Sequence, residues 1–125
     1  GMPMNTVMGT ILGQIPGEGE LKIHDDRPIR DFLWVEDAAA AICNMALGQM
    51  KGIYNVGSGI GTSIGQLADL CLKLSGNSHR TVLSEYSSTR LSSLVLNIAA
   101  TIQECNWQPE VSLSDGMERL LKQRE

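Results

Sequence analysis

The sequence predicts a mixed α/β domain in which short strands alternate with helices. Apolar residues recur at helical spacing in several segments, and short runs rich in Val, Ile and Leu separate most of these segments. The chain has 125 residues, of which 42% are hydrophobic and 19% charged, as is typical of a single globular domain. No internal repeat or low-complexity tract interrupts this pattern.

Helical spacing of apolar residues predicts the helices. The first covers 4–15 and ends at Pro16-Gly17, because these residues do not continue a helix. Ser63 and Gln66 have the spacing of a capping box and begin another helix. Asn106 tolerates a left-handed conformation and ends a third. After the first helix, the predicted helices thus cover 36–48, 63–74, 98–105 and 112–121.

Short apolar runs predict the strands, and one of them precedes an Ala-rich helix. That helix has Glu36 in its first turn, where the macrodipole favours an acid. Its apolar stripe includes Ala41 and Ile42, and Gly48 ends it. The Ser-rich segment 84–93 is predicted to be a loop. The predicted strands are Leu21–Ile23, 32–35, 53–56 and 81–83.

Charge and cysteine content exclude several classes of protein. The chain has 10 basic and 14 acidic side chains, without a basic run, which argues against a nucleic-acid partner. It has no long uncharged apolar stretch and no visible signal peptide, so we expect no membrane span and a cytoplasmic location. Cys43, Cys71 and Cys105 lie in apolar helical patterns and are expected to be reduced and buried.

The glycine run from Gly57 to Gly61 follows a predicted strand and precedes a helix, as a dinucleotide-binding loop does. Its spacing differs, however, because Thr62 stands where that loop needs Gly or Ala. No acidic residue follows a second strand at the distance needed to bind a ribose. We therefore interpret the run as a flexible turn between strand and helix.

Arg30 is the main candidate for a ligand-binding side chain. An arginine at the mouth of a short strand can hold a phosphate by bidentate hydrogen bonds, but it can equally form a surface salt bridge with Asp31 or Glu36. His24 and the acids near it suggest a metal site, although turns and helix starts explain the same acids. The serines of the polar loop, among them Ser84, Ser87 and Ser88, show no basic partner for nucleophilic catalysis.

Three blocks of sequence, in the correct order, cover most of the chain. They read LKIHDDRPIRDFLWVED, GIYNVGSGIGTSIGQLADL and ECNWQPEVSLSDGMERL. The first is similar to L-x-I-Y-G-D-G-x-x-x-R-D-F-x-x-V-x-D, and the last to E-L-G-W-x-P-x-x-S-L-x-E-G-L. Together they resemble the C-terminal, substrate-binding part of the NAD(P)-dependent nucleotide-sugar epimerases and dehydratases of the extended short-chain dehydrogenase/reductase family.

This resemblance implies a C-terminal substrate domain over 3–125, with Gly1-Met2 as a tag scar and start. The family binds NAD(P) on an N-terminal Rossmann domain, which we expect to be absent here, so this chain itself should hold no cofactor. The family's catalytic Y-x-x-x-K pair is also missing, because Tyr54 is followed at the fourth position by Ser58 and Tyr86 by Arg90. We therefore expect no catalytic residue, no metal and no activity from the chain alone.

The resemblance also implies three substrate-binding residues. Arg30 matches the arginine that contacts the nucleotide diphosphate, and Asn55 matches the Asn of the strand-turn motif. Arg90 lies near the place of a second phosphate-contacting arginine, where a simple alignment puts Ser87. Asn97 replaces an Asp that would cap the following helix, which Asn can also do.

The expected partners are a nucleotide-diphosphate sugar, the Rossmann domain of the parent enzyme and a second copy of the chain. The run 53–56 should complete the Rossmann sheet, and its bare edges would favour a homo-oligomer. The alternative function is a stand-alone, non-catalytic binding or oligomerisation module. The sugar, the nucleotide and the choice between epimerase, dehydratase and reductase stay open.

Overall fold

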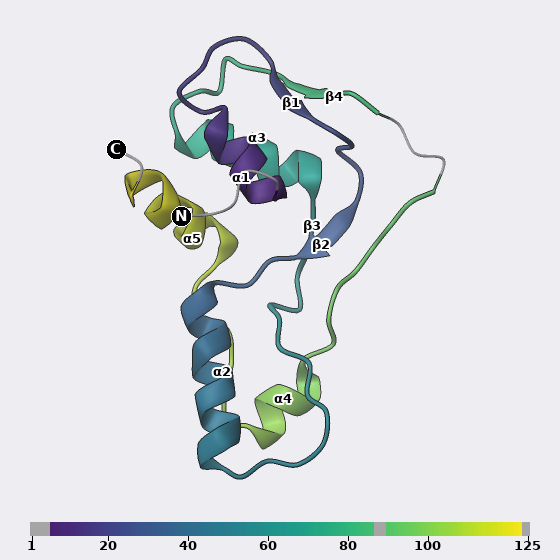
Figure 1. Ribbon diagram of the computed structural model, residues 1–125, viewed down its shortest axis with the longest axis vertical. Coiled ribbons are helices and arrows are strands. Elements are labelled where there is room, and N and C mark those ends of the chain that lie inside the picture. Colours follow the sequence, from purple (N-terminus) through teal and green to yellow (C-terminus); the bar gives the residue numbers. More distant parts are fainter. Residues whose placement is uncertain (1–5, 87–89, 124–125) are drawn as a thin grey trace.

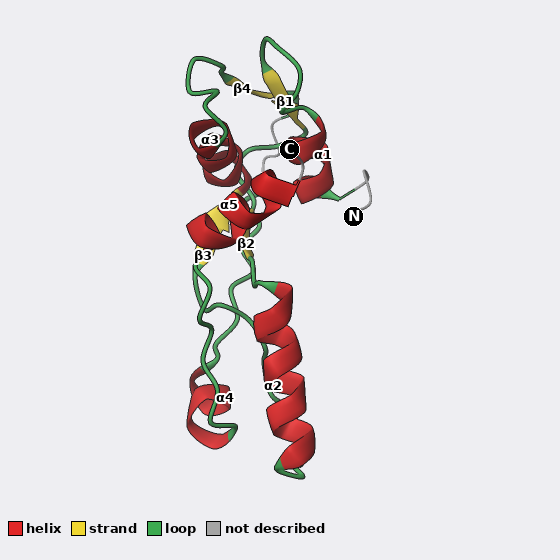
Figure 2. Ribbon diagram, turned by 90° about the vertical axis from the view of Figure 1, so that its left-hand side faces the viewer, coloured by secondary structure: helices red, strands yellow, loops and turns green. Residues whose placement is uncertain are grey.

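Two clusters of apolar side chains organise the fold and lie at opposite ends of an elongated molecule. In the computed structural model, residues 6–86 and 90–123 are described. Helices α1, α3 and α5 gather with strands β1 and β4 at one end, and α2 lies beside α4 at the other (Figures 1 and 2). The elements are α1 (Val7–Gly13), β1 (Leu21–Ile23), β2 (Ile29–Asp31), α2 (Val35–Leu47), β3 (Gly61–Ser63), α3 (Ile64–Leu74), β4 (Val82–Ser84), α4 (Ala99–Glu104) and α5 (Leu113–Gln123). The mixed α/β prediction is confirmed.

The larger cluster, which we call the upper core, is aliphatic. Its most deeply buried members come from α1, β1, α3 and α5, so four separate segments share one interior. Burial of such side chains contributes about 1.5–3 kcal/mol each relative to exposure. The buried side chains of the upper core are Ile11, Leu12, Leu21, Ile23, Ile64, Leu67, Ala68, Cys71, Leu72 and Met117.

The smaller cluster, the lower core, joins α2 to α4 and to the segment that follows α4. Ala41 of α2 is fully buried against Ile98, Cys105 and Trp107. The Trp107 indole also donates from Nε1 to the Asp37 carbonyl at 2.9 Å. The lower core is small, and it depends on one tryptophan that fills the space between the two helices.

The strands form two short pairs, of which β1–β4 belongs to the upper end and β2–β3 lies between the two ends (Figures 1 and 2). Strands β1 and β4 pair in parallel, and β2 and β3 pair antiparallel with Arg30 opposite Thr62. A parallel bridge between Ile29 and Ser93 places a third segment on the free edge of β2. Strand β2 is therefore flanked on both sides, by β3 and by the segment around Ser93.

Local capping signals behave as the sequence predicts. The Ser63 hydroxyl accepts from the Gln66 amide at 3.1 Å, and the Gln66 side chain accepts from the Ser63 amide at 2.9 Å, which completes the capping box of α3. Asn106 has φ 48°, the predicted left-handed conformation. Helix α1 begins after Thr6, whose hydroxyl accepts from Gly9; residues 4 and 5 of the helix predicted over 4–15 lie outside the described residues.

Buried Arg80 closes the end of α1 without a carboxylate. Its Nε donates to the Gly19 carbonyl at 2.8 Å, and its Nη1 donates to the carbonyls of Gln14 and Ile15 at 2.9 and 3.2 Å. Carbonyls at a helix C-terminus lack intrahelical donors and carry partial negative charge, so they suit a guanidinium. Arg80 thus ties the segment before β4 to the end of α1.

Two strand predictions are wrong. The apolar run 32–35 is not a strand: Phe32 packs against the upper core, Leu33 packs against the lower core, and exposed Val35 already begins α2. The more polar residues Ile29–Asp31 make the ladder instead. The run 53–56 is also irregular: Ile53 is 97% exposed, and no strand within the described residues pairs with it. Periodicity identifies residues that suit a strand, but a strand also needs a partner.

Exposure corrects two further expectations. Cys43 is exposed, whereas Cys71 and Cys105 are buried as predicted. Ile42 is also 62% exposed, although the helical pattern placed it in the apolar stripe of α2. Within the described part of the chain, no helix has the length and apolarity needed to cross a bilayer.

Candidate functional site

Arg30 lies in the middle of β2 and is half-buried. Its Nη1 donates to the carbonyl of Ile29 at 2.8 Å and to that of Ser92 at 3.4 Å. Both acceptors are neutral, and the one ion pair recorded among residues 6–86 and 90–123 joins Arg27 to Asp25. The guanidinium is therefore held in place without having its charge neutralised by a carboxylate.

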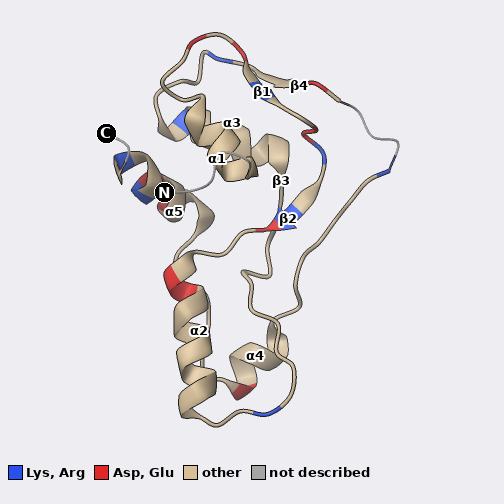
Figure 3. Ribbon diagram, viewed as in Figure 1, with Lys and Arg blue, Asp and Glu red and all other residues tan. Residues whose placement is uncertain are grey.

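Asp31, the next residue, is surrounded by donors. Its carboxylate accepts from the Ser58 amide at 2.7 Å, the Ser58 hydroxyl at 2.7 Å, the Gly59 amide at 2.9 Å and the Leu96 amide at 3.2 Å. Figure 3 shows the basic and the acidic position side by side in β2. The salt bridge between Arg30 and Asp31 that the sequence leaves open is not formed, because Asp31 is bonded elsewhere.

The glycine run is shaped around this carboxylate. Gly59 has φ 74°, which favours glycine. A Cβ at Gly57 would stand 2.8 Å from both Asp31 Oδ2 and Leu96 Cδ1. The amides of Ser58 and Gly59 thus face an internal anion, and the pyrophosphate of a dinucleotide would have to displace it.

Burial and hydrogen bonding act in opposite directions on Asp31. Burial raises its pKa, but the hydrogen bonds from Ser58, Gly59 and Leu96 outweigh this effect and lower the pKa below the ordinary value of 3.8. Asp31 is therefore ionised throughout the neutral range, which is the state that four donors require.

Asn55 bonds to the chain around the start of α4, and Arg30 bonds to Ile29 and Ser92. Its Nδ2 donates to the Asn97 carbonyl at 3.0 Å, and its own carbonyl accepts from the Thr101 hydroxyl at 2.6 Å. The Asn97 side chain in turn accepts from the Ala99 amide at 3.1 Å. The prediction that Asn97 caps this helix is nevertheless wrong, because the N-cap of α4 is Ile98 and makes no side-chain capping bond. Asn55 therefore fixes the approach to α4 in this structure.

Arg90 lies on the segment that runs beside β2. It is exposed and precedes by two residues Ser92, whose carbonyl holds Arg30. Ser87, the alternative at that place in the alignment, lies outside the described residues. The structure thus associates Arg30 with the segment of Arg90, while Asn55 belongs to the segment near Asn97; the bond from Leu96 to Asp31 connects the two.

A cavity of about 250 Å³ lies next to the β2–β3 pair. Thr62 lines it and stands opposite Arg30 in the register, and cross-strand partners project to the same face. Phe32, Ser58 and Ile60 line it as well. Arg30 itself does not line this cavity, which is connected to the arginine only through its cross-strand partner Thr62.

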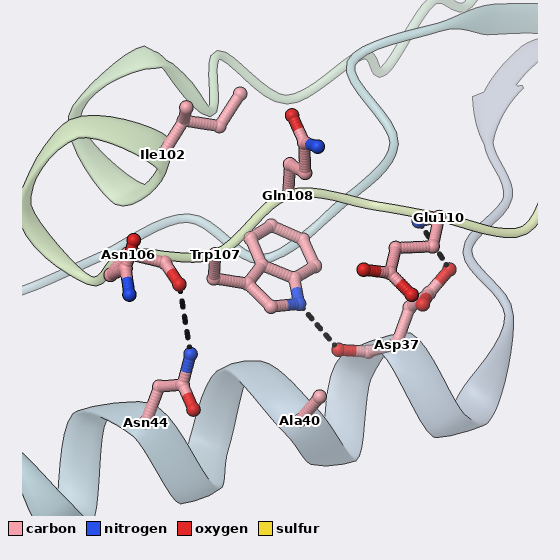
Figure 4. A pocket seen from close by; sticks show the side chains of 8 residues that line it. All are labelled: Asp37, Ala40, Asn44, Ile102, Asn106, Trp107, Gln108 and Glu110. Carbon is pink, nitrogen blue, oxygen red and sulfur yellow. Dashed lines mark hydrogen bonds between the residues drawn. The ribbon is translucent and has the colours of Figure 1, made fainter.

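A second cavity, of about 470 Å³, lies between α2 and the segment after α4 (Figure 4). Its polar groups bond to one another: the Asp37 carboxylate accepts from the amides of Glu110 and Val111, and Asn44 donates to the Asn106 carbonyl. It contains none of the predicted site residues. These bonds hold α2 to the chain that covers it, so we assign this cavity a structural role.

His24 stacks on Tyr86, with ring centroids 4.9 Å apart and planes inclined by 11°. Among the described residues, no group of three His, Cys, Asp or Glu side chains could hold a metal ion. The other tyrosine, Tyr54, has its pKa raised by burial and by the nearby Glu104 and Cys105. An acid/base tyrosine needs the opposite shift to work at neutral pH.

The chain is similar to parts of known proteins. The chain is 26% identical over 112 residues to dTDP-4-dehydro-6-deoxyglucose reductase of Escherichia coli, covering 81% of this chain and 35% of that protein. It is 30% identical over 92 residues to a putative GDP-L-fucose synthase 2 of Arabidopsis thaliana, covering 72% and 27%. No protein-family model matches the chain.

Solved structures show the same fold. RMD of Pseudomonas aeruginosa, complexed with NADPH, superposes with a TM-score of 0.87 at 21% identity, covering 98% of this chain and 43% of that one. The dTDP-glucose 4,6-dehydratase of Bacillus anthracis, in complex with NAD, gives 0.83 at 16% identity, covering 95% and 39%. The chain belongs to the extended short-chain dehydrogenase/reductase family of nucleotide-sugar enzymes.

This assignment confirms the family predicted from the three sequence blocks, which identified the chain with the C-terminal part of such an enzyme. The chain spans about a third of the length of the curated relatives it matches. The sequence analysis did not predict the role of Asp31, the acid of the R-D-F motif. Its identity is visible in the sequence, but the Ser58 and Leu96 amides that donate to it lie 27 and 65 residues away along the chain.

The lowered pKa of Asp31 predicts how stability depends on pH. In the unfolded chain the group titrates near 3.8 and in the folded chain below that value. Its ionised form therefore stabilises the fold above 3.8, and this contribution is lost as the pH falls through the folded pKa. We predict that Asp31→Asn has a smaller free energy of unfolding than the wild type at neutral pH. Between about pH 4 and about pH 2, its free energy of unfolding should fall by less than that of the wild type. Urea unfolding across this range measures the difference, and an equal acid-induced loss in both proteins would contradict it.

Proposed function

We propose that this chain binds the diphosphate of a nucleotide sugar and forms the substrate-holding part of an NAD(P)-dependent epimerase, dehydratase or reductase. The observation that carries the proposal is the guanidinium of Arg30, which is positioned by two carbonyls and not neutralised by a carboxylate. The names of the relatives support the substrate class, since they include UDP-, dTDP- and GDP-linked sugars.

Arg30 suits a diphosphate better than a single neutral group. A guanidinium presents several donors in a planar fork, and two phosphate oxygens can accept from it at once. Arg90, on the neighbouring segment, would add a second positive charge when the ligand is bound. Asn55 would contribute only after exchanging its bond to Asn97 for one to the nucleotide. We therefore rank Arg30 first among the three.

The state of the glycine turn supports the proposal that this chain holds no nicotinamide dinucleotide there. The glycine turn offers its amides to Asp31, so the donors that a pyrophosphate needs at such a turn are occupied. In the parent enzyme the cofactor would supply hydride transfer, and neighbours of this fold are described with NADPH or NAD. We propose that this chain holds substrate and excludes water, has no activity alone, and works in the cytoplasm.

A second role, association with another polypeptide surface, is favoured by the composition of α2. Charged side chains occur only at the start of this helix, as Figure 3 shows. Ala41 is buried, yet Ile42 and Leu47 are 62% and 85% exposed. A helix that is apolar on most sides is normally covered on most sides. In the parent enzyme the Rossmann domain would cover this surface, and in the isolated chain a second copy would.

The binding role is tested by removing the guanidinium. Arg30→Ala should weaken binding of UDP by roughly 10- to 100-fold, because a charge-assisted hydrogen bond is lost. Binding of uridine, which lacks the diphosphate, should change little. Arg119→Ala removes the same charge from α5, where the guanidinium lies 5.6 Å from the Trp34 ring, and serves as the matched control. Titration calorimetry with the purified chain measures all three, and unchanged UDP affinity in Arg30→Ala would remove this residue from the role.

The association role is tested by light scattering of the purified chain. We expect a dimer or larger assembly, because the apolar face of α2 is otherwise left in water. Ile42→Glu should shift the chain towards monomer, whereas Gln103→Glu, an added charge at an exposed position of α4, should not. A wild-type chain that stays monomeric at high concentration would refute self-association through this face.

A further inference from the structure

Arg30 and Asp31 are neighbours in sequence but project to opposite faces of β2. Side chains alternate along a strand, so adjacent residues cannot share a face without breaking the strand. Arg30 bonds to the carbonyls of Ile29 and Ser92, while Asp31 faces the glycine turn and the Leu96 amide. An acid that would otherwise compete with a phosphate for the guanidinium is thereby kept away from it.

The donors to Asp31 come from both segments that flank β2. Ser58 and Gly59 belong to the turn that leads directly into β3, the partner on one edge. Leu96 belongs to the segment that lies along the other edge, where Ile29 donates to Ser92 and accepts from Leu94. One carboxylate therefore fixes the two neighbours of the strand that carries Arg30.

This arrangement determines where Arg30 can lie. The Ser92 carbonyl that accepts from Arg30 belongs to the segment that the two backbone bonds of Ile29 and the Asp31–Leu96 bond together hold against β2. If the Leu96 end of that segment moved away, the geometry at Ser92 would change and the guanidinium would lose part of its support. The position of the positive charge thus depends in part on an acid with which it shares no hydrogen bond.

We propose that Asp31 is a positioning residue for the anion site: by binding both flanking segments it holds Arg30 at Ser92 and keeps its own carboxylate on the opposite face. This inference rests on the proposed function of Arg30. It adds that Asp31 fixes the position of the guanidinium before a diphosphate binds. The lowered pKa of Asp31 agrees with this role, since only the ionised carboxylate can accept from all its donors.

Simple electrostatics predicts the opposite effect of mutation. Removing a negative charge next to an anion site should strengthen anion binding. A positioning role predicts weaker binding, because in Asp31→Asn an NH₂ group would face either the Gly59 and Leu96 amides, which share Oδ2, or the Ser58 amide at Oδ1. In either orientation a flanking segment loses an acceptor. The sign of the change in affinity therefore separates the two explanations.

The experiment is a double-mutant cycle in the full chain, with UDP as the probe. Asp31→Asn should weaken UDP binding by about five- to tenfold in the Arg30 background and have almost no effect in the Arg30→Ala background, since its action passes through Arg30. Asp26→Asn, in the turn before β2, removes the same charge and should leave affinity equal or slightly tighter. Stronger UDP binding by Asp31→Asn, or the same loss in both backgrounds, would overturn the inference.

A ligand-free measurement keeps this test separate from the proposed function. The Nε–H resonance of Arg30 in a ¹⁵N correlation spectrum should shift in Asp31→Asn and stay in place in Asp26→Asn. Ser58→Ala, which removes one donor to Asp31 and leaves the turn amides, should give a smaller shift in the same direction and covers the case that Asp31→Asn does not fold. If the chain binds no UDP, the proposed function fails. If the chemical shift of the Arg30 Nε–H is the same in the wild type, Asp31→Asn and Ser58→Ala, the positioning role fails.

Discussion

The carboxylate of Asp31 is the contact on which the middle of this molecule depends. The upper core and the lower core are separate, and the segments between them are mostly irregular. Irregular backbone needs partners for its N–H groups, and Asp31 supplies acceptors to the glycine turn and to Leu96 at once. The same contact fixes the segments on both edges of β2, and β2 is the strand that carries Arg30, the proposed ligand-binding residue.

The two ends of the molecule differ in how completely their helices are buried. The upper core draws side chains from four segments, α1, β1, α3 and α5. The lower core is small, and α2 leaves Ile42 and Leu47 in water. The curated relatives are more than twice as long as this chain, and a larger enzyme would have surface available to cover α2. Arg30, the proposed substrate-binding residue, lies in the strand pair between the upper core and helix α2, whose exposed apolar face we propose another polypeptide surface covers.

The sequence predicts most of the fold because most of its signals are local. The capping box at Ser63, the left-handed Asn106 and the stop after α1 are each determined by neighbouring residues, and the structure confirms them. The strands are harder to predict, since 53–56 has the right composition but no partner among the described residues, whereas Gly61–Ser63 has poor composition and pairs with β2. Arg30 could be selected through family resemblance; the partners of Asp31 could not, because they come from distant parts of the chain.

Amide hydrogen exchange of the ligand-free chain tests the central contact most directly. If Asp31 holds the glycine turn and the segment after β4 together, the amides of Ser58, Gly59 and Leu96 should exchange slowly and with similar protection. They should also become fast together in Asp31→Asn, while amides of the upper core such as Leu67 remain protected. Exchange of these three amides as fast as that of exposed Ile53, or Leu96 protection that survives the substitution, would contradict the account.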